Sequence, residues 1–117
     1  MNLIIDIGNT TAKAALFNGN DIVEERRYGS LTTADTESIL TDHPHIEAAI
    51  LCSVGSYDKG VDELLSGSIA RFVQFGAETP VPIGNAYATP ATLGSDRLAA
   101  AVGAVSLYGA DKNLLIV

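Results

Sequence analysis

The apolar residues of this chain fall into short runs separated by turn-forming residues. The first run, Leu3-Ile4-Ile5, predicts a strand that ends at Asp6. Gly8-Asn9-Thr10 then predicts a turn, because Gly and Asn tolerate positive φ and Asn and Thr side chains hydrogen-bond their own turn. Lys13 to Phe17 predicts a second strand that returns beside the first.

A third strand is expected over residues 22–28, after the turn signal at 18–21. Residues 2–28 would then form a three-stranded antiparallel meander. The charged run from Glu24 to Arg27 fits the solvated face of an edge strand. Thr33 is expected to cap a short helix over 34–41, which ends before Pro44.

A continuous apolar run at 48–54 predicts a strand buried on both faces, and hence a parallel sheet. Ser56 or Asp58 would open a second helix, and residues 71–75 would form another strand. This order predicts an α/β domain in which the meander is extended by parallel strands through right-handed crossovers, with helices on both faces. The layout is that of a ribonuclease-H-like fold.

Composition narrows the class of protein. The 117 residues suffice for one domain, and no apolar run approaches the roughly 18 residues of a membrane span. A net charge of −7 argues against nucleic acid or an anionic membrane as a partner. Without a basic leader, and with Cys52 as the single cysteine, a cytoplasmic location is the default expectation.

The first turn has the composition of a phosphate site. A turn of this kind aims backbone N–H groups and the Thr10 and Thr11 hydroxyls at one point. Asp6 at its rim is suited to hold Mg²⁺, or a water bound to it, against that phosphate. The alternative is an ordinary hairpin in which Asp6 caps the turn.

A second polar segment follows the loop at 76–93, which carries three of the four prolines. Ser95 is expected to cap an apolar helix from Leu98 to Tyr108. At the start of that helix, Arg97 is suited to clamp a carboxylate and Asp96 to accept a proton from an attacking hydroxyl. The alternative is that Asp96 only complements the helix dipole and that Arg97 is exposed.

Two motifs carry a resemblance to a known family. Asp-Ile-Gly-Asn-Thr-Thr at 6–11 resembles the first phosphate loop of the actin/Hsp70/sugar-kinase superfamily, and its Asn is most similar to that of type III pantothenate kinases. The segment at 87–97 resembles the pantothenate segment of those kinases, in which Tyr, Asn-Pro and Gly-x-Asp-Arg follow one another. Thr89 stands where that Asn is usual.

The resemblance implies an ATP-dependent kinase that phosphorylates pantothenate, with Mg²⁺, a stimulating K⁺ or NH₄⁺, and a homodimer. It implies that Asp96 is the proton acceptor. It also implies a pantothenate site made of Tyr87, Gly94, Ser95, Asp96 and Arg97. The ATP phosphate loop would comprise Asp6, Ile7, Gly8, Asn9, Thr10, Thr11, Ala12 and Lys13.

The apolar residues 113–117 predict the start of another buried strand. The family continues from such a strand into Asp-x-Gly-Thr-Ala, a second phosphate motif that helps to bind the monovalent cation. Residues 1–117 would therefore be the N-terminal lobe, with the cation ligand beyond Val117. Whether these residues catalyse the reaction unaided stays open.

Other functions remain open alternatives. One is a transcription-associated relative, the Bvg accessory factor; another is a ribonuclease-H-like nuclease. A nuclease would need several carboxylates around two metals and a basic track, whereas this chain offers Asp6 without such a track. His43 and His45 are expected at the surface, and Cys52 in the core.

Overall fold

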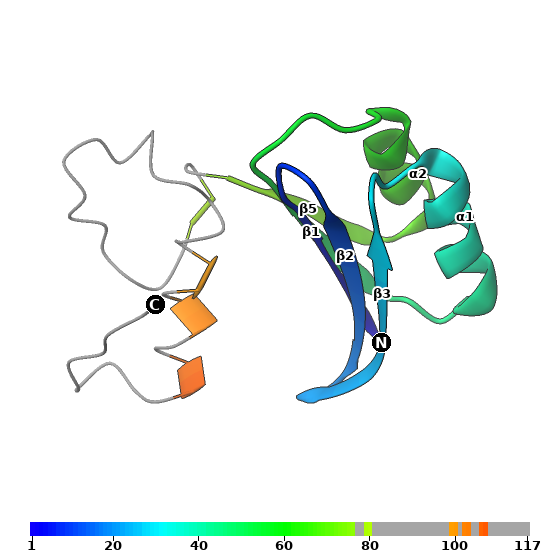
Figure 1. Cartoon of the computed structure of the whole chain (residues 1–117). Coiled ribbons are helices and arrows are strands. Elements are labelled where there is room, and N and C mark those ends of the chain that lie inside the picture. Colours follow the sequence, from blue (N-terminus) through cyan, green and yellow to red (C-terminus); the bar gives the residue numbers. More distant parts are fainter. Residues whose placement is uncertain (77–78, 81–98, 101, 104–105, 108–117) are drawn as a thin grey trace, which may run out of the picture. The chain divides into compact units, whose positions relative to one another are not determined.

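The computed structural model describes residues 1–76, 79–80, 99–100, 102–103 and 106–107 (Figure 1). The chain divides into two compact units, Met1–Gln74 and Phe75–Val117. In the second unit, the described residues between 99 and 107 are helical, in agreement with the helix expected there. No helix in the described part of the chain is long and apolar enough to cross a membrane.

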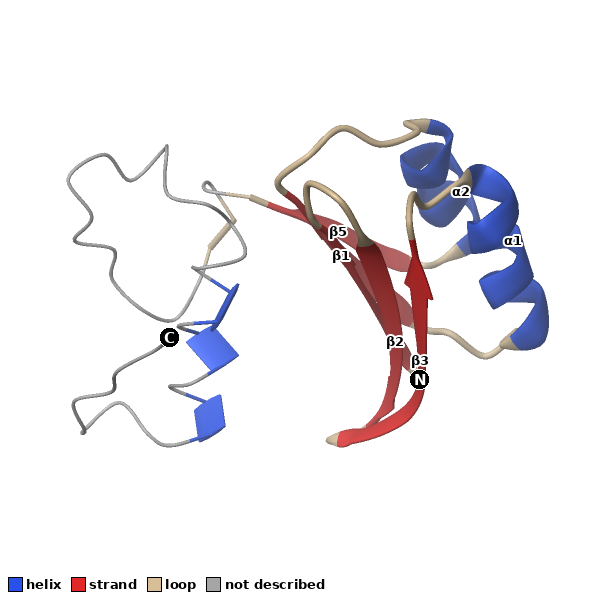
Figure 2. Ribbon diagram, in the orientation of Figure 1, coloured by secondary structure: helices blue, strands red, loops and turns tan. Residues whose placement is uncertain are grey.

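The first unit is built on a mixed five-stranded sheet of order β3-β2-β1-β4-β5 (Figure 2). The strands β1 (Asn2–Ile7), β2 (Ala12–Asn18) and β3 (Asp21–Tyr28) form the expected antiparallel meander. On the other side of β1, β4 (Ala48–Ser53) pairs with it in parallel, and β5 (Arg71–Phe75) forms the far edge. The predicted meander and its extension by the parallel strand β4 are therefore confirmed.

Alternate residues of the central strands face a single hydrophobic core. Leu3, Ile5 and Ile7 of β1 are buried, as are the residues opposite them in β2. The helices α1 (Thr33–Asp42) and α2 (Gly60–Ser68) complete this core from one side. Among the described residues, the buried apolar ones are Leu3, Ile5, Ile7, Ala12, Ala14, Leu16, Leu31, Ile39, Ala49, Leu51, Val61, Leu65 and Ile69.

Both helices of this unit lie on the same face of the sheet, rather than on opposite faces (Figure 1). The connection through α1 leads across the sheet to β4, and the connection through α2 continues in the same direction to β5. Right-handed crossovers that advance in one direction place their helices on one face. A helix on the opposite face is therefore not part of the described first unit.

The expectation that β4 is buried on both faces is wrong for the first unit. Ala49 and Leu51 are buried, whereas Ile50 and Cys52, which point to the opposite face, are only half-buried. On that same face, Ile4 of β1 keeps 39 % of its surface exposed. The apolar run was continuous because neither face is fully solvated, although only one face is covered by α1 and α2.

Helix α1 begins one residue earlier than expected. Thr32, not Thr33, is the N-cap: its hydroxyl accepts the N–H of Asp35 at 3.1 Å, and the Asp35 carboxylate accepts the N–H of Thr32 at 3.0 Å. This reciprocal capping box selects Thr32 because only a residue three positions before an acidic side chain can complete it.

The charged strand β3 lies at the sheet edge, as expected, but its side chains are more ordered than a solvated face requires. Arg26 binds Glu24 at 3.0 Å and Asp42 of α1 at 2.7 Å. His43 Nε2 lies 2.9 Å from the same Glu24 carboxylate, and its side chain is only 18 % exposed. The hydrogen bonds from His43 and then Arg26 lower the pKa of Glu24. His43, expected at the surface, thus helps to join β3 to the end of α1.

Gly67 offers a direct test of the packing of α2. A Cβ at this helical position would meet no atom within 4 Å. Gly67→Ala is therefore expected to stabilise the protein by about 0.5–1 kcal/mol, because Ala has the higher helix propensity and the methyl group meets open space. Chemical denaturation of the two proteins measures the difference. A loss of stability would contradict this account of α2.

Candidate functional site

The candidate site lies at the edge of the sheet where the parallel strands β1 and β4 both end. Ile7 stands opposite Ser53 in the parallel register, and the N–H of Val54 donates to the Ile7 carbonyl at 3.0 Å. In open α/β sheets, ligands bind outside the carboxyl ends of the strands. The turn between β1 and β2 projects at this edge.

This turn, residues Gly8–Thr11, is called the polar turn below. The N–H of Gly8 donates to the Thr11 carbonyl at 2.9 Å and closes the turn. Positive φ, the expected reason for Gly8 and Asn9, is wrong: among the described residues that φ occurs at Gly19, at 62°. Gly8 is instead constrained by space, because a Cβ there would lie 3.3 Å from the Thr11 carbonyl oxygen.

A pocket of about 140 Å³ lies against the polar turn. Its polar side chains come from Asn9, Thr11, Ser30 and Ser56. Its lining as a whole comprises Ile7, Gly8, Asn9, Thr11, Ala12, Gly29, Ser30, Leu31, Ser56 and Tyr57. Hydroxyl and amide groups around a small cavity are suited to hold a phosphate group.

Three chain segments meet at this pocket, and sequence reasoning singled out only one of them as a ligand site. The residues 29–31 between β3 and α1, and Ser56 and Tyr57 between β4 and α2, join the polar turn there. The Gly-Ser pair at 29–30 was the only local signal of the second segment, and such pairs are common in loops. The tertiary structure alone brings the three together.

The predicted phosphate-loop residues divide between the two faces of the sheet. Ile7, Gly8, Asn9, Thr11 and Ala12 line the pocket, whereas Asp6, Thr10 and Lys13 do not. Asp6 and Lys13 stand directly opposite each other on β1 and β2, and both are exposed on the face away from the helices. The division follows from strand alternation, because Ile7 and Ala12 point into the core.

Asp6 has the carboxylate of a magnesium ligand, but it lies on the sheet face opposite the pocket. Asp6 precedes Ile7 at the end of β1, next to the polar turn, and its carboxylate is exposed. Mg²⁺ is usually held by one or two carboxylates together with water and substrate phosphates, so a single protein carboxylate suffices. Within the described ranges, no three His, Cys, Asp or Glu side chains gather as a metal cage.

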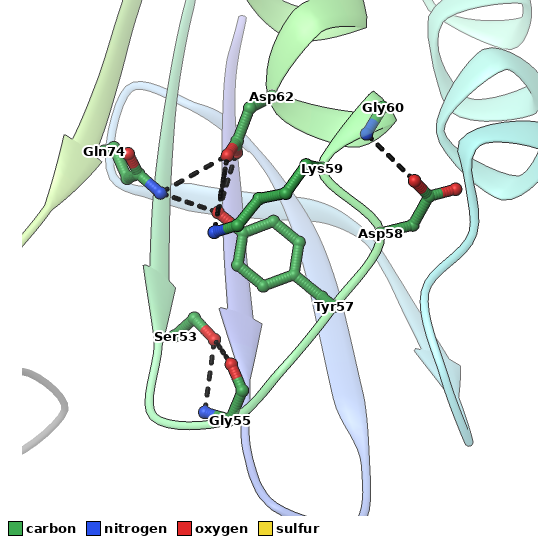
Figure 3. Close-up of polar contacts among 8 residues, drawn as sticks. All are labelled: Ser53, Gly55, Tyr57, Asp58, Lys59, Gly60, Asp62 and Gln74. Carbon is green, nitrogen blue, oxygen red and sulfur yellow. Dashed lines mark hydrogen bonds and ion pairs between the residues drawn. The ribbon is translucent and has the colours of Figure 1, made fainter.

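The loop between β4 and α2, residues 54–59, is fixed by a set of polar contacts (Figure 3). The hydroxyl of Tyr57 donates to the Asp62 carboxylate at 2.8 Å and accepts the side-chain amide of Gln74 at 2.7 Å. The Lys59 ammonium lies 4.3 Å from the centre of the Tyr57 ring. Burial, followed by the Asp62 carboxylate, raises the pKa of Tyr57 to about 12, so the phenol stays protonated and keeps donating at neutral pH.

Neither of the two residues expected to open α2 is its N-cap, because that position is Lys59, which makes no side-chain capping bond. Asp58 comes just before Lys59. Its carboxylate accepts the N–H of Gly60 at 2.9 Å and the hydroxyl of Thr33 at 2.8 Å. These bonds, the Gly60 N–H first, lower the pKa of Asp58. Asp58 therefore ties the start of α2 to the start of α1 behind the pocket.

The predicted substrate residues lie outside the described residues. They are Tyr87, Gly94, Ser95, Asp96 and Arg97. Their roles stay predictions.

The geometry described so far is that of an α/β domain with a polar, phosphate-sized pocket at the carboxyl edge of its parallel strands. Residues 2–117 match the family model of the type III pantothenate kinases. The chain belongs to the type III pantothenate kinase family.

Individual relatives agree with the family match. The chain is 41 % identical over 116 residues to the type III pantothenate kinase of Phocaeicola vulgatus, covering 99 % of this chain and 48 % of that protein. It is 38 % identical over 117 residues to the type III pantothenate kinase of Azobacteroides pseudotrichonymphae, and the match covers 100 % of this chain and 47 % of that protein. The identity to the type III pantothenate kinase of Christiangramia forsetii is 37 % over 118 residues, and the match covers 100 % of this chain and 48 % of that protein. The chain thus spans about half the length of the curated relatives it matches.

Proposed function

We propose that the whole protein transfers the γ-phosphoryl group of ATP to the terminal hydroxyl of pantothenate. The product, 4′-phosphopantothenate, is the first intermediate of coenzyme A biosynthesis in this family. The observation that carries the proposal is the family match over residues 2–117, and the polar pocket at the sheet edge supports it.

The polar turn would receive the phosphates of ATP. Asn9 and Thr11 offer an amide and a hydroxyl at the pocket, and charge on a phosphate is stabilised by such donors. Asp6 would hold Mg²⁺, which neutralises the charge that develops on the transferring group. Asp6 and Lys13 lie on the sheet face opposite the pocket, so Lys13 would add a positive charge only to phosphates that extend over the polar turn to that face.

Pantothenate would be bound by the segment from Tyr87 to Arg97. In this proposal Arg97 pairs with the pantothenate carboxylate, and Asp96 accepts the proton of the attacking hydroxyl. Gly94, Ser95 and Tyr87 complete the site. Phosphoryl transfer depends mainly on positioning and charge stabilisation, so Asp96 needs only to lie within hydrogen-bond reach of that hydroxyl.

The remaining parts of the proposal concern the whole molecule. The fold would be the ribonuclease-H-like fold of the actin/Hsp70/sugar-kinase superfamily, with a second lobe beyond Val117. That lobe would supply the second phosphate motif and the ligand of K⁺ or NH₄⁺. The protein would act as a homodimer in the cytoplasm, without a nucleic acid or membrane partner, as the charge of −7 suggests.

The test is formation of 4′-phosphopantothenate by the full-length protein from ATP, Mg²⁺ and pantothenate. Turnover is expected to need all three, and to rise when K⁺ or NH₄⁺ replaces Na⁺. The 117-residue chain, assayed in parallel, reports whether the first half suffices. If the full-length protein gives no product under either cation condition, the kinase proposal is wrong.

A further inference from the structure

We propose that Gly55 is a positioning residue for the polar turn. The proposal rests on the phosphoryl-transfer function above and adds a residue outside the Asp6–Lys13 stretch. A Cβ at Gly55 would lie 3.0 Å from the carbonyl oxygen of Gly8 and 3.7 Å from both Cα and Oδ1 of Asn9. The missing side chain therefore lets the β4–α2 loop lie directly against the turn that lines the pocket.

A methyl group at this position is not absorbed by a flexible side chain. Its nearest neighbour is a backbone oxygen, and the distance is shorter than the roughly 3.5 Å at which non-bonded heavy atoms attract most strongly. Either the β4–α2 loop or the polar turn must move by a few tenths of an ångström. Which of the two moves decides the effect on the pocket.

The loop is held on the side that precedes Gly55. The Ser53 hydroxyl donates to the Gly55 carbonyl at 2.6 Å, and the Gly55 N–H donates back to the same hydroxyl at 3.2 Å (Figure 3). Val54, which lies between Ser53 and Gly55 in the sequence, donates its N–H to the Ile7 carbonyl at 3.0 Å. These bonds anchor the start of the loop to its own strand and to β1.

The loop is also held on the side that follows Gly55. Tyr57 packs against the hydrophobic core, and its hydroxyl bonds both Asp62 of α2 and Gln74 of β5. Asn9, in contrast, is exposed. The polar turn is therefore the part that yields when a side chain is added at Gly55.

A displaced turn would misdirect the groups offered to the phosphates. Asn9 and Thr11 line the pocket, so a shift of Gly8 and Asn9 moves donors that must meet phosphate oxygens. A misplacement of 1 Å costs on the order of 10²-fold in rate, and a few tenths of an ångström is expected to cost about tenfold. The displaced turn should weaken the binding of ATP and leave the binding of pantothenate unchanged.

The decisive experiment compares Gly55→Ala with the natural full-length protein. The KM for ATP is expected to rise about tenfold, while the KM for pantothenate and the melting temperature change little. ATP binding measured by calorimetry without pantothenate should weaken by a similar factor. Gly67→Ala is the matched control, because it adds the same methyl group in open space and is expected to leave both KM values unchanged.

Ser53→Ala keeps the proposal testable if Gly55→Ala does not fold. It removes atoms rather than adding them, breaks both bonds that hold Gly55, and is expected to raise the KM for ATP by a smaller factor, about threefold. If the folded variants keep the KM for ATP of an active natural protein, the proposed role of Gly55 is wrong, while the proposed function stands. A natural protein that neither binds ATP nor forms product would overturn the proposed function instead.

Discussion

Asp96→Asn in the full-length protein is expected to lower kcat for pantothenate phosphorylation by about 10²–10⁴-fold, the usual contribution of a general base. The amide keeps the size of the carboxylate and still accepts a hydrogen bond, but it does not take up the proton of the attacking hydroxyl. The KM for ATP should stay nearly the same, because the proposed ATP contacts belong to the polar turn. Initial rates over a range of both substrates measure the two effects.

Asp21→Asn is the matched control for this substitution. The turn between β2 and β3 lies at the opposite end of these strands from the polar turn (Figure 1). Asp21, whose exposed carboxylate follows this turn, is paired with Asn18. The same chemical change at that end should leave kcat and both KM values unaltered. If Asp96→Asn kept a kcat close to that of the natural protein, Asp96 would not be the proton acceptor.

Leu65→Ala is expected to destabilise the protein by about 2–5 kcal/mol. Leu65 is fully buried in α2, where it belongs to the core that the sheet shares with both helices. Truncation removes buried apolar atoms and leaves a cavity, because strands and helices that pack around it relax only in part. Chemical denaturation of the two proteins measures this loss in the free energy of unfolding.

Leu64→Ala supplies the comparison within the same helix. Leu64 precedes Leu65 and is only half-buried, and the change in helix propensity is the same at both positions. Leu64→Ala is expected to lose less stability than Leu65→Ala, and the difference between the two variants measures the effect of burial. Equal losses for the two variants would contradict the orientation of α2 against the sheet.

Local patterns predicted the elements of the first unit well. The meander, the parallel strand β4 and the strand β5 all occur where apolar runs and turn signals placed them. The cap of α1 was misplaced by one residue because two adjacent threonines compete for that position. Asp35 selects Thr32 through a bond that the Thr pattern alone does not reveal.

The polar turn was recognised from its residues, but for a partly mistaken reason. Gly8 was attributed to positive φ, whereas the structure assigns it a close approach to the Thr11 carbonyl. Both needs select glycine, so the sequence pattern is the same for either. Asp6 lies on the face opposite the pocket because alternate residues of β1 face opposite sides of the sheet and its neighbour Ile7 faces the core.

The sequence by itself determined the order of strands and helices in the first unit, the polar turn, and membership of the kinase family through its two motifs. Only the tertiary structure decided that α1 and α2 share one face of the sheet. It alone brought residues 29–31 and Ser56 to the turn, and it alone set Gly55 against Gly8. The physical reason is range: turns, caps and strand periods depend on neighbours within a few residues. A pocket, in contrast, depends on backbones about 20–50 residues apart, whose meeting is set by sheet order and crossover direction.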